Sequence, residues 1–389
     1  MKNFLRAQDT ESTMNAFRRL GVGITGEGGT LTINGKGLHG LSEPSDVIDC
    51  GNSGTTIRLI SGVLSGNPFF SVLTGDDSLR SRPMARVIGP LGMMGAQISA
   101  RSDNRFPPLA IKGGALRPLR YEMPVASAQV KSSLLLAGLY CEGETEISEP
   151  TQSRDHTERM LPAQGADLRT EGLRVFVRGG RELSPMEMEV PGDFSSAAFF
   201  IVAALLVPGS EIIARNVGIN PTRTGLLRAL SMMGAAVEIQ NAREMSGEPV
   251  ADLRCTSPAG LKAVGLTEEI IPSLIDEFPV LCIAAAHAEG FTTIRGAGEL
   301  RVKESDRIRA MASELKKMGV KVEEYPDGIG IQGAAGLKGA EVDSHGDHRI
   351  AMAMAVGALA AEGVTTIRNA SAVGISFPSF FDTLARLSS

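Results

Sequence analysis

A unit of roughly 70 residues recurs along this chain of 389 residues, and this recurrence restricts the possible folds more than any single motif does. The first half of the unit is a small or polar cluster, an apolar run, a glycine and a β-branched segment. The distance from the polar residue to the glycine is nearly constant, which is typical of a helix of about four turns followed by a strand. The five copies are residues 52–66, 127–143, 193–209, 276–290 and 347–363.

The second half of the unit is a more polar amphipathic helix that ends at a glycine before a strand. The marker glycines recur at similar intervals and are Gly21, Gly95, Gly165, Gly234 and Gly319. Residues 380–387 have the pattern of a sixth such helix. Six second halves but only five first halves are present, and the missing first half would precede Met1. We therefore expect the first repeat to be truncated at its N-terminus, although a naturally incomplete terminal repeat would give the same count.

The repeats divide into two groups of three, which predicts two similar α/β domains. We place these domains at residues 1–189 and 190–389, with the boundary near the proline-bracketed strand of residues 185–191. Each domain is expected to hold three repeats, and only the first repeat of residues 1–189 is expected to be truncated.

Composition excludes several classes of protein. A net charge of −5 and an aromatic content of 4% argue against a nucleic-acid surface. The longest strongly apolar stretch, residues 197–207, is too short to span a bilayer. The four scattered cysteines have no zinc-ligand spacing. We expect a cytoplasmic protein that binds neither a metal nor a membrane.

Residues suited to small anionic ligands gather where the first-half helices begin. Residues 51–56 offer small side chains, hydroxyl groups and backbone N–H donors at a helix start, although a capped helix without a ligand would look the same. Ser127 is expected to cap the next such helix, and Lys131, taken alone, is predicted to be a solvated surface charge. Arginines recur at equivalent repeat positions, which favours binding of a carboxylate or phosphate. They are Arg82, Arg154, Arg223 and Arg307.

Two further helix starts carry acid–base groups. Asp276 and Glu277 lie in an apolar segment, where burial would raise a carboxyl pKa and suit proton transfer. A helix cap with an exposed neighbour is the alternative for this pair. His348, between Asp347 and Arg349, is interpreted as a pocket residue beside an anion.

Several of these runs together resemble the 5-enolpyruvylshikimate-3-phosphate (EPSP) synthase family, and the resemblance covers the whole chain. The runs are residues 51–55, 81–84, 126–132, 154–158, 220–224, 301–307 and 347–349. The resemblance implies a two-domain inside-out α/β prism of six βαβαββ-type repeats whose domains close over the substrates. It also implies transfer of the enolpyruvyl group of phosphoenolpyruvate to the 5-hydroxyl of shikimate 3-phosphate with release of phosphate, a step of aromatic amino-acid biosynthesis, without a cofactor or metal.

The same resemblance assigns roles to residues. It implies that Asp276 accepts the hydroxyl proton, that Glu304 exchanges a proton at the methylene carbon beside Lys303, and that His348 belongs to the catalytic set. The implied phosphoenolpyruvate contacts are Gly54, Arg82, Gln129, Arg307 and Arg349. The implied shikimate 3-phosphate contacts are Ser127, Ala128, Gln129, Arg154, Asp276 and Lys303, with Asn52 and Thr55 lining the cleft.

One departure from the family pattern affects the expected activity. Family members begin with a Lys-Ser…Arg cluster on a helix, which has no counterpart from Met1 onward and corresponds to the missing half-repeat. We therefore expect activity to be impaired or to depend on a complementing N-terminal fragment. Two alternatives stay open at this point. They are an enolpyruvyl transferase of the same fold that acts on a nucleotide sugar, and a non-catalytic half of a split enzyme that binds substrate or a complementing fragment.

Overall fold

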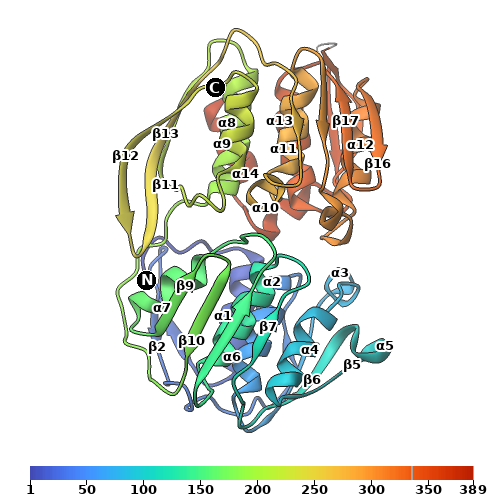
Figure 1. Ribbon diagram of the computed structural model, residues 1–389. Helices are drawn as coiled ribbons and strands as arrows, with labels where there is room; N and C mark the ends of the chain where they lie inside the picture. Colours follow the sequence, from blue (N-terminus) through green and yellow to red (C-terminus); the bar gives the residue numbers. More distant parts are fainter. Residues whose placement is uncertain (334–335, 389) are drawn as a thin grey trace. The chain divides into compact units, whose positions relative to one another are not determined.

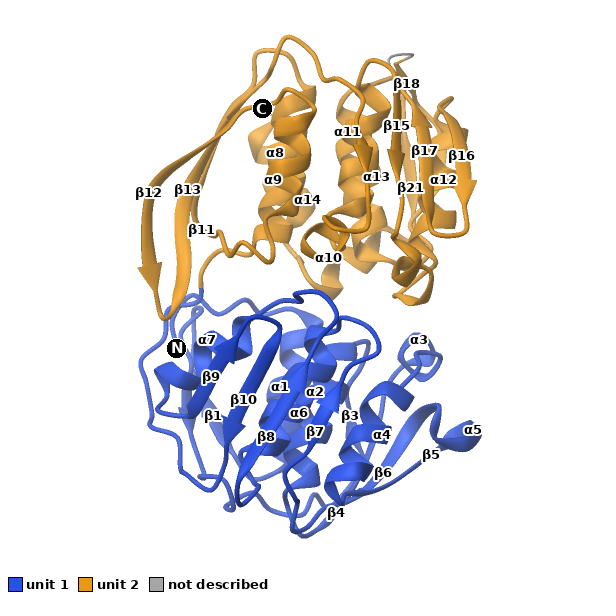
Figure 2. Ribbon diagram, viewed as in Figure 1, with its two compact units in different colours: residues 1–190 blue, residues 191–389 orange. Residues whose placement is uncertain are grey.

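The structure is a computed structural model that describes residues 1–333 and 336–388. The chain divides into two compact units, Met1–Val190 and Pro191–Ser389, coloured separately in Figure 2. This division falls next to the boundary that the sequence suggests. Among the described residues we find no helix with both the length and the apolar character needed to cross a bilayer.

Unit 1 contains interior helices from the first half of the repeat, outer helices from the second half, and small sheets. Its helices are α1 (Gln8–Arg19), α2 (Gly54–Ser65), α3 (Asp77–Arg80), α4 (Ala85–Met94), α5 (Arg101–Asn104), α6 (Ala128–Gly138) and α7 (His156–Ala163). Its strands are β1 (Gly23–Thr25), β2 (Thr32–Asn34), β3 (Ile48–Asp49), β4 (Phe70–Thr74), β5 (Gln97–Ala100), β6 (Phe106–Lys112), β7 (Arg120–Glu122), β8 (Glu144–Ser148), β9 (Asp167–Glu171) and β10 (Arg174–Arg178).

Unit 2 is built from the same kinds of element. Its helices are α8 (Phe194–Leu206), α9 (Gly225–Met232), α10 (Ile271–Leu274), α11 (Phe278–His287), η1 (Gly298–Val302), α12 (Arg307–Lys317), α13 (His348–Leu359), η2 (Ala370–Ile375) and α14 (Phe380–Leu387). Its strands are β11 (Glu211–Gly218), β12 (Val237–Met245), β13 (Glu248–Thr256), β14 (Gly265–Leu266), β15 (Phe291–Ile294), β16 (Lys321–Tyr325), β17 (Gly328–Gln332), β18 (Leu337–Lys338), β19 (Glu341–Asp343), β20 (Ala361–Glu362) and β21 (Thr366–Arg368).

The sheets confirm that one topology is repeated. Three four-stranded sheets have the orders β3-β4-β6-β5, β7-β8-β10-β9 and β14-β15-β17-β16. In each of them the first pair is parallel and the other two pairs are antiparallel. The parallel pair flanks a buried helix, because a parallel connection needs a crossover of a dozen or more residues. The repeating unit is therefore β-α-β-α-β-β.

Local signals in the sequence explain where the helices begin and end. Four of the five first-half helices start at a side chain that accepts a backbone N–H: Ser53, Ser127, Asp193 and Asp347. All five marker glycines follow second-half helices and have φ between 85° and 113°, a region that favours glycine. Gly66 differs, because its φ is −86° and a Cβ there would lie 2.2 Å from the Tyr140 ring. Close packing, rather than the backbone turn, requires this glycine.

The apolar cores of the two units are organised differently. In unit 2 the helices α8, α11 and α13 contact one another pairwise between the β11–β13 sheet and the β15–β17 strands (Figure 1), and their buried residues belong to one cluster. Within residues 1–190, two first-half helices, α2 and α6, contact each other, and the buried residues form two separate clusters. Unit 1 thus has one interior helix fewer than unit 2.

Candidate active-site residues on the two units

In unit 1, polar side chains meet where α2 and α6 begin. Gln129 links the two helices, since its side chain accepts a hydrogen bond from Arg58 Nη1 (2.8 Å) and donates one to Thr55 Oγ1 (2.9 Å). Arg82, buried at 6% exposure, donates to the Asn52 side-chain oxygen at 2.6 Å. The structure therefore brings together four predicted site residues from three separate segments of the sequence.

Gly54 makes room for the cations of this cluster. A Cβ at this position would lie 2.8 Å from Arg58 Nη1 and 3.1 Å from Arg82 Nη1. Both guanidinium groups therefore lie against the first turn of α2, where backbone N–H groups and the helix dipole also favour an anion. Ala128 is the first residue of α6 after the Ser127 cap, so its backbone N–H adds a donor of the same kind.

Lys131 is not the solvated surface charge that the sequence suggested. Its side chain is 1% exposed, with Nζ 2.7 Å from Glu149 Oε1 and 2.6 Å from Glu158 Oε1. Burial raises the pKa of Glu158, although the Lys131 charge opposes this shift. The prediction failed because both carboxylates come from a later segment of the chain, beyond strand β8. This segment carries the half-buried Arg154, so the buried ion pairs fix the Arg154 segment to α6.

In unit 2, a buried arginine organises the predicted catalytic residues. The Arg307 side chain is 1% exposed and contacts Asp347 through Nε (2.8 Å), Glu304 through Nη2 (2.7 Å) and Asp276 through Nη1 (3.3 Å). Burial alone would lower the pKa of Arg307, but these carboxylates, led by Asp347, raise it. The Arg307 guanidinium therefore stays charged and holds three acidic side chains around it.

Asp276 lies between two guanidinium groups rather than in a purely apolar setting. Arg349 Nη2 is 3.3 Å from Asp276 Oδ2, and Arg349 Nη1 donates to the Asp276 backbone carbonyl at 3.3 Å. The second oxygen of the carboxylate faces Arg307. Lys303 directly precedes Glu304 in the segment between η1 and α12 and is half-buried. Within unit 2, Asp276, Glu304, Arg307 and Arg349 thus form one connected group.

Glu277 is the buried member of the Asp-Glu pair, and the structure excludes the alternative of a cap with an exposed neighbour. Its side chain is 1% exposed, no side-chain cap bond starts α11, and Ser195 donates a hydrogen bond to it. Burial raises the pKa of Glu277, whereas the nearby Arg223 charge opposes this shift. Ser195 also accepts a hydrogen bond from Arg223 at 2.5 Å. The apolar neighbours in the sequence signal this burial, whereas Ser195 and Arg223 come from distant segments.

His348 is buried beside this group, at 5% exposure. Burial and the neighbouring Arg349 charge lower its pKa to about 4, so the imidazole is neutral at pH 7. Its Nδ1 has no hydrogen-bond partner among the residues that the structure describes. A neutral ring with an unpaired nitrogen can donate or accept one hydrogen bond, but it cannot add positive charge for an anion.

The lowered pKa predicts that His348 destabilises the folded protein in acid. The unfolded chain takes up a proton near pH 6.5, whereas the folded chain does so near pH 4, so the free energy of unfolding falls as pH decreases between these values. The full effect is about 3 kcal/mol at this buried site. We expect His348→Gln to reduce the loss of unfolding free energy between pH 7 and pH 4 by this amount. The measurement is the denaturation midpoint at each pH. His39→Gln, the same substitution at an exposed position, is the matched control.

The described residues include no group of three or more His, Cys, Asp or Glu side chains that could hold a metal ion. A model of the EPSP synthase family, 3-phosphoshikimate 1-carboxyvinyltransferase, matches residues 1–384. The chain belongs to the EPSP synthase family. Within this family, a 3-phosphoshikimate 1-carboxyvinyltransferase of Thermodesulfovibrio yellowstonii is 54% identical over 389 residues, which are all of this chain and 90% of the relative.

Solved structures agree with this assignment. EPSP synthase from Acinetobacter baumannii is 47% identical and has a TM-score of 0.88, with 99% of this chain and 89% of the other covered. The enolpyruvyl transferase NikO from Streptomyces tendae, at 19% identity and a TM-score of 0.76 over 98% of this chain and 87% of the other, shares the fold. The predicted inside-out prism and the predicted family are therefore confirmed, and the nucleotide-sugar alternative is not favoured.

Proposed function

We propose that this chain transfers the enolpyruvyl group of phosphoenolpyruvate to the 5-hydroxyl of shikimate 3-phosphate and releases phosphate. The observation that best supports this proposal is the Asp276 carboxylate between the Arg307 and Arg349 guanidinium groups, with Glu304 on the same Arg307. Such a group combines a proton acceptor, a second acid and two cations for carboxylate and phosphate charge. We further propose that residues 1–189 and 190–389 act as two three-repeat domains in the cytoplasm.

The proposed roles account for each bond change. Asp276 accepts the proton of the 5-hydroxyl as the hydroxyl oxygen bonds to C2 of phosphoenolpyruvate. Glu304, with Lys303 beside it, delivers a proton to the methylene carbon C3, which becomes a methyl group. In the second step the bond from C2 to the phosphate oxygen breaks, phosphate leaves, and the methyl group returns one proton to restore the double bond.

The remaining predicted residues are proposed to bind the two substrates. Phosphoenolpyruvate is held by Gly54, Arg82, Gln129, Arg307 and Arg349, whose backbone and side-chain donors suit a carboxylate and a phosphate. Shikimate 3-phosphate is held by Ser127, Ala128, Gln129, Arg154, Asp276 and Lys303, with Asn52 and Thr55 lining the site. His348 offers a neutral hydrogen-bonding nitrogen to the reacting groups.

We also propose that efficient turnover needs a complementing fragment. The chain covers 90% of the T. yellowstonii relative, so about a tenth of that relative has no counterpart here. The test compares phosphate release from phosphoenolpyruvate and shikimate 3-phosphate by the chain alone and with those residues added as a peptide. We expect slow release alone and faster release with the peptide. Brisk turnover without the peptide would contradict the dependence, and equal release with a nucleotide sugar as acceptor would contradict the substrate.

A small substitution should report on phosphoenolpyruvate binding. In Gly54→Ala the new methyl group would push against Arg58 and Arg82, so the KM for phosphoenolpyruvate should rise about tenfold. The KM for shikimate 3-phosphate should change little. Gly89→Ala is the matched control, because it also lies in a helix of unit 1 and a Cβ there meets nothing within 4 Å. An unchanged KM in Gly54→Ala would remove Gly54 and Arg82 from the proposed phosphoenolpyruvate site.

A further inference from the structure

Residues 301–306 lead from the end of η1 into α12 and carry Lys303 and Glu304, the residues proposed for proton transfer at C3. The segment is only partly packed, since Val302 is 50% exposed and Lys303 and Glu304 are half-buried. Apolar burial therefore does not fix the position of Glu304. Its orientation depends on polar contacts at the two ends of the segment.

The end of the segment next to α12 is fixed to that helix and to the start of α13. The Ser305 hydroxyl donates a hydrogen bond to Asp347 Oδ2 at 3.1 Å. The Asp306 side chain accepts the Arg309 backbone N–H at 3.0 Å and so caps α12. This end of the segment therefore follows α12.

The opposite end of the segment is held by Arg301. Its Nη2 donates to the Tyr325 carbonyl at 2.6 Å, and its Nε donates to the Pro326 carbonyl at 2.7 Å. Its Nη1 lies 3.0 Å from Glu324 Oε1 and 2.8 Å from Asp306 Oδ2. All three nitrogens of the guanidinium group are thus bound to acceptors, and the planar shape of the group fixes the direction of each bond.

These contacts join the segment to a rigid part of unit 2. The acceptors outside the segment belong to the β16–β17 hairpin, and β16 packs against α12 (Figure 1). The bond from Arg301 to Asp306 closes residues 301–306 into a loop, with Lys303 and Glu304 between its anchored ends. Because the Asp306 carboxylate also caps α12, both anchors share one side chain. The loop is therefore held in one conformation from both ends.

We propose that Arg301 is a positioning residue for proton transfer at C3 of phosphoenolpyruvate, because it fixes the backbone that carries Lys303 and Glu304. The inference rests on the proposed function and adds a residue to it. A misplacement of a reacting group by about 1 Å can cost on the order of 10²-fold in rate. Arg307 also contacts two carboxylates outside the segment, so this cation stays in place when Arg301 is replaced.

The test separates proton transfer from binding in Arg301→Ala. We expect kcat for phosphate release to fall about 10- to 100-fold. The ratio of kcat in H₂O to kcat in D₂O should rise, because proton delivery to C3 becomes the slower step. The KM for shikimate 3-phosphate should rise because Lys303 moves with the segment, whereas the KM for phosphoenolpyruvate should stay within about twofold of the parent value. Arg301→Lys keeps the charge without the planar group and should restore part of the kcat.

A matched control and a structural measurement accompany this test. Arg295→Ala is the control, because Arg295 pairs with Asp327 of the same hairpin at 2.8 Å and its described partners lie outside residues 301–306. It should change neither the kinetic constants nor the isotope ratio. Hydrogen exchange of residues 301–306 should become faster in Arg301→Ala, while exchange of α11 and α13 should not change.

The outcomes decide the role of Arg301. An isotope ratio equal to that of the parent would overturn the proposal, whatever the change in kcat. Faster exchange in α11 and α13 would also overturn it, because Arg301 would then stabilise unit 2 as a whole. If the parent released no phosphate, only the proposed function would be contradicted. Unaltered exchange of residues 301–306 in Arg301→Ala would still show that Arg301 does not fix the segment.

Discussion

Asp276→Asn is expected to lower kcat for phosphate release by about 10²- to 10⁴-fold, the usual cost of removing a general base. The amide keeps the shape of the carboxyl group but cannot accept the hydroxyl proton. It also removes a negative charge from between Arg307 and Arg349, so the site becomes more attractive to an anion. The KM for phosphoenolpyruvate should therefore fall or stay the same. The measurement is steady-state phosphate release with the complementing peptide present.

A lower kcat without a higher KM for phosphoenolpyruvate would assign Asp276 to proton transfer and not to positioning of the arginines. A residue that only positions the arginines would raise KM when it is replaced, because the cations would move. Asp327→Asn is the matched control, because Asp327 also pairs with an arginine of unit 2, at 2.8 Å from Arg295, which is not a proposed site residue. It should change neither constant. A kcat of Asp276→Asn within about tenfold of the parent value would remove Asp276 from the proposed proton transfer.

Lys131→Met is expected to be the most destabilising single change in unit 1. Methionine fills a similar volume but leaves Glu149 and Glu158 buried, at 4% and 7% exposure, without their cation. Breaking a buried ion pair on one side costs about 3–5 kcal/mol. Hydrogen exchange of residues 128–138 and 149–158 measures this loss of stability locally. A local measurement is preferable because a chain of two units need not unfold in a single two-state step. Binding of shikimate 3-phosphate should weaken as well, because Arg154 lies in the affected segment.

Two further variants complete this test. Arg368→Met breaks an ion pair whose partners are 64% and 58% exposed, and it should have a much smaller effect because exposed pairs contribute little. Adding Glu149→Gln and Glu158→Gln to Lys131→Met removes the unpaired charges and should recover much of the loss. If the backbone amides of residues 128–138 exchange as slowly in Lys131→Met as in Arg368→Met, the buried ion pairs do not stabilise α6.

The sequence predicts the architecture well because residues within one turn of each helix end mark where the helices of the repeat begin and end. The glycine after each second-half helix and the polar residue before most first-half helices act within one turn, so Gly319 and Ser53 could be interpreted without knowledge of distant contacts. Asp276 and Arg307 could be proposed for the site because their helix starts are marked in the same way. The strand order could be inferred only through the family, since pairing partners lie far apart in the chain.

The errors concern partners that only folding brings together. The sequence predicts a solvated Lys131, because its neighbours in sequence do not indicate Glu149 and Glu158 as partners. The sequence predicts an apolar environment for Asp276, yet Arg307 from the second half of the same repeat and Arg349 from the next repeat approach it. The sequence allows two interpretations of Glu277 for the same reason, because Ser195 and Arg223 belong to a different repeat.

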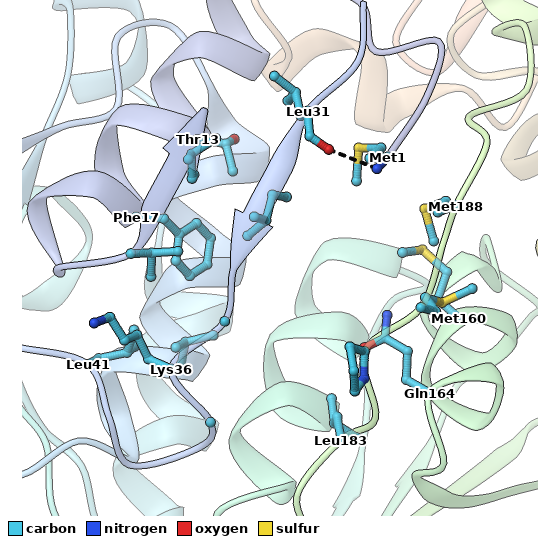
Figure 3. Close-up of a pocket in the computed structure, with 18 of the residues that line it drawn as sticks. Met1, Thr13, Phe17, Leu31, Lys36, Leu41, Met160, Gln164, Leu183 and Met188 are labelled. Atoms are coloured by element: carbon cyan, nitrogen blue, oxygen red, sulfur yellow. Dashed lines mark hydrogen bonds between the residues drawn. The ribbon is translucent and has the colours of Figure 1, made fainter. Parts of the chain in front are cut away.

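The first residues of the chain close unit 1 by pairing with its last ones. The Lys2 backbone N–H donates to the Met188 carbonyl at 2.7 Å, and the Val190 N–H donates to the Lys2 carbonyl at 3.0 Å. During synthesis the chain emerges N-terminus first, at about 5–20 residues per second, so this pairing must wait until the chain has been made as far as Val190. Met1 and Met188 both line an apolar cavity of unit 1 (Figure 3). The pairing that closes unit 1 therefore forms only about 10 to 40 seconds after Met1 has been made, when synthesis has reached Val190.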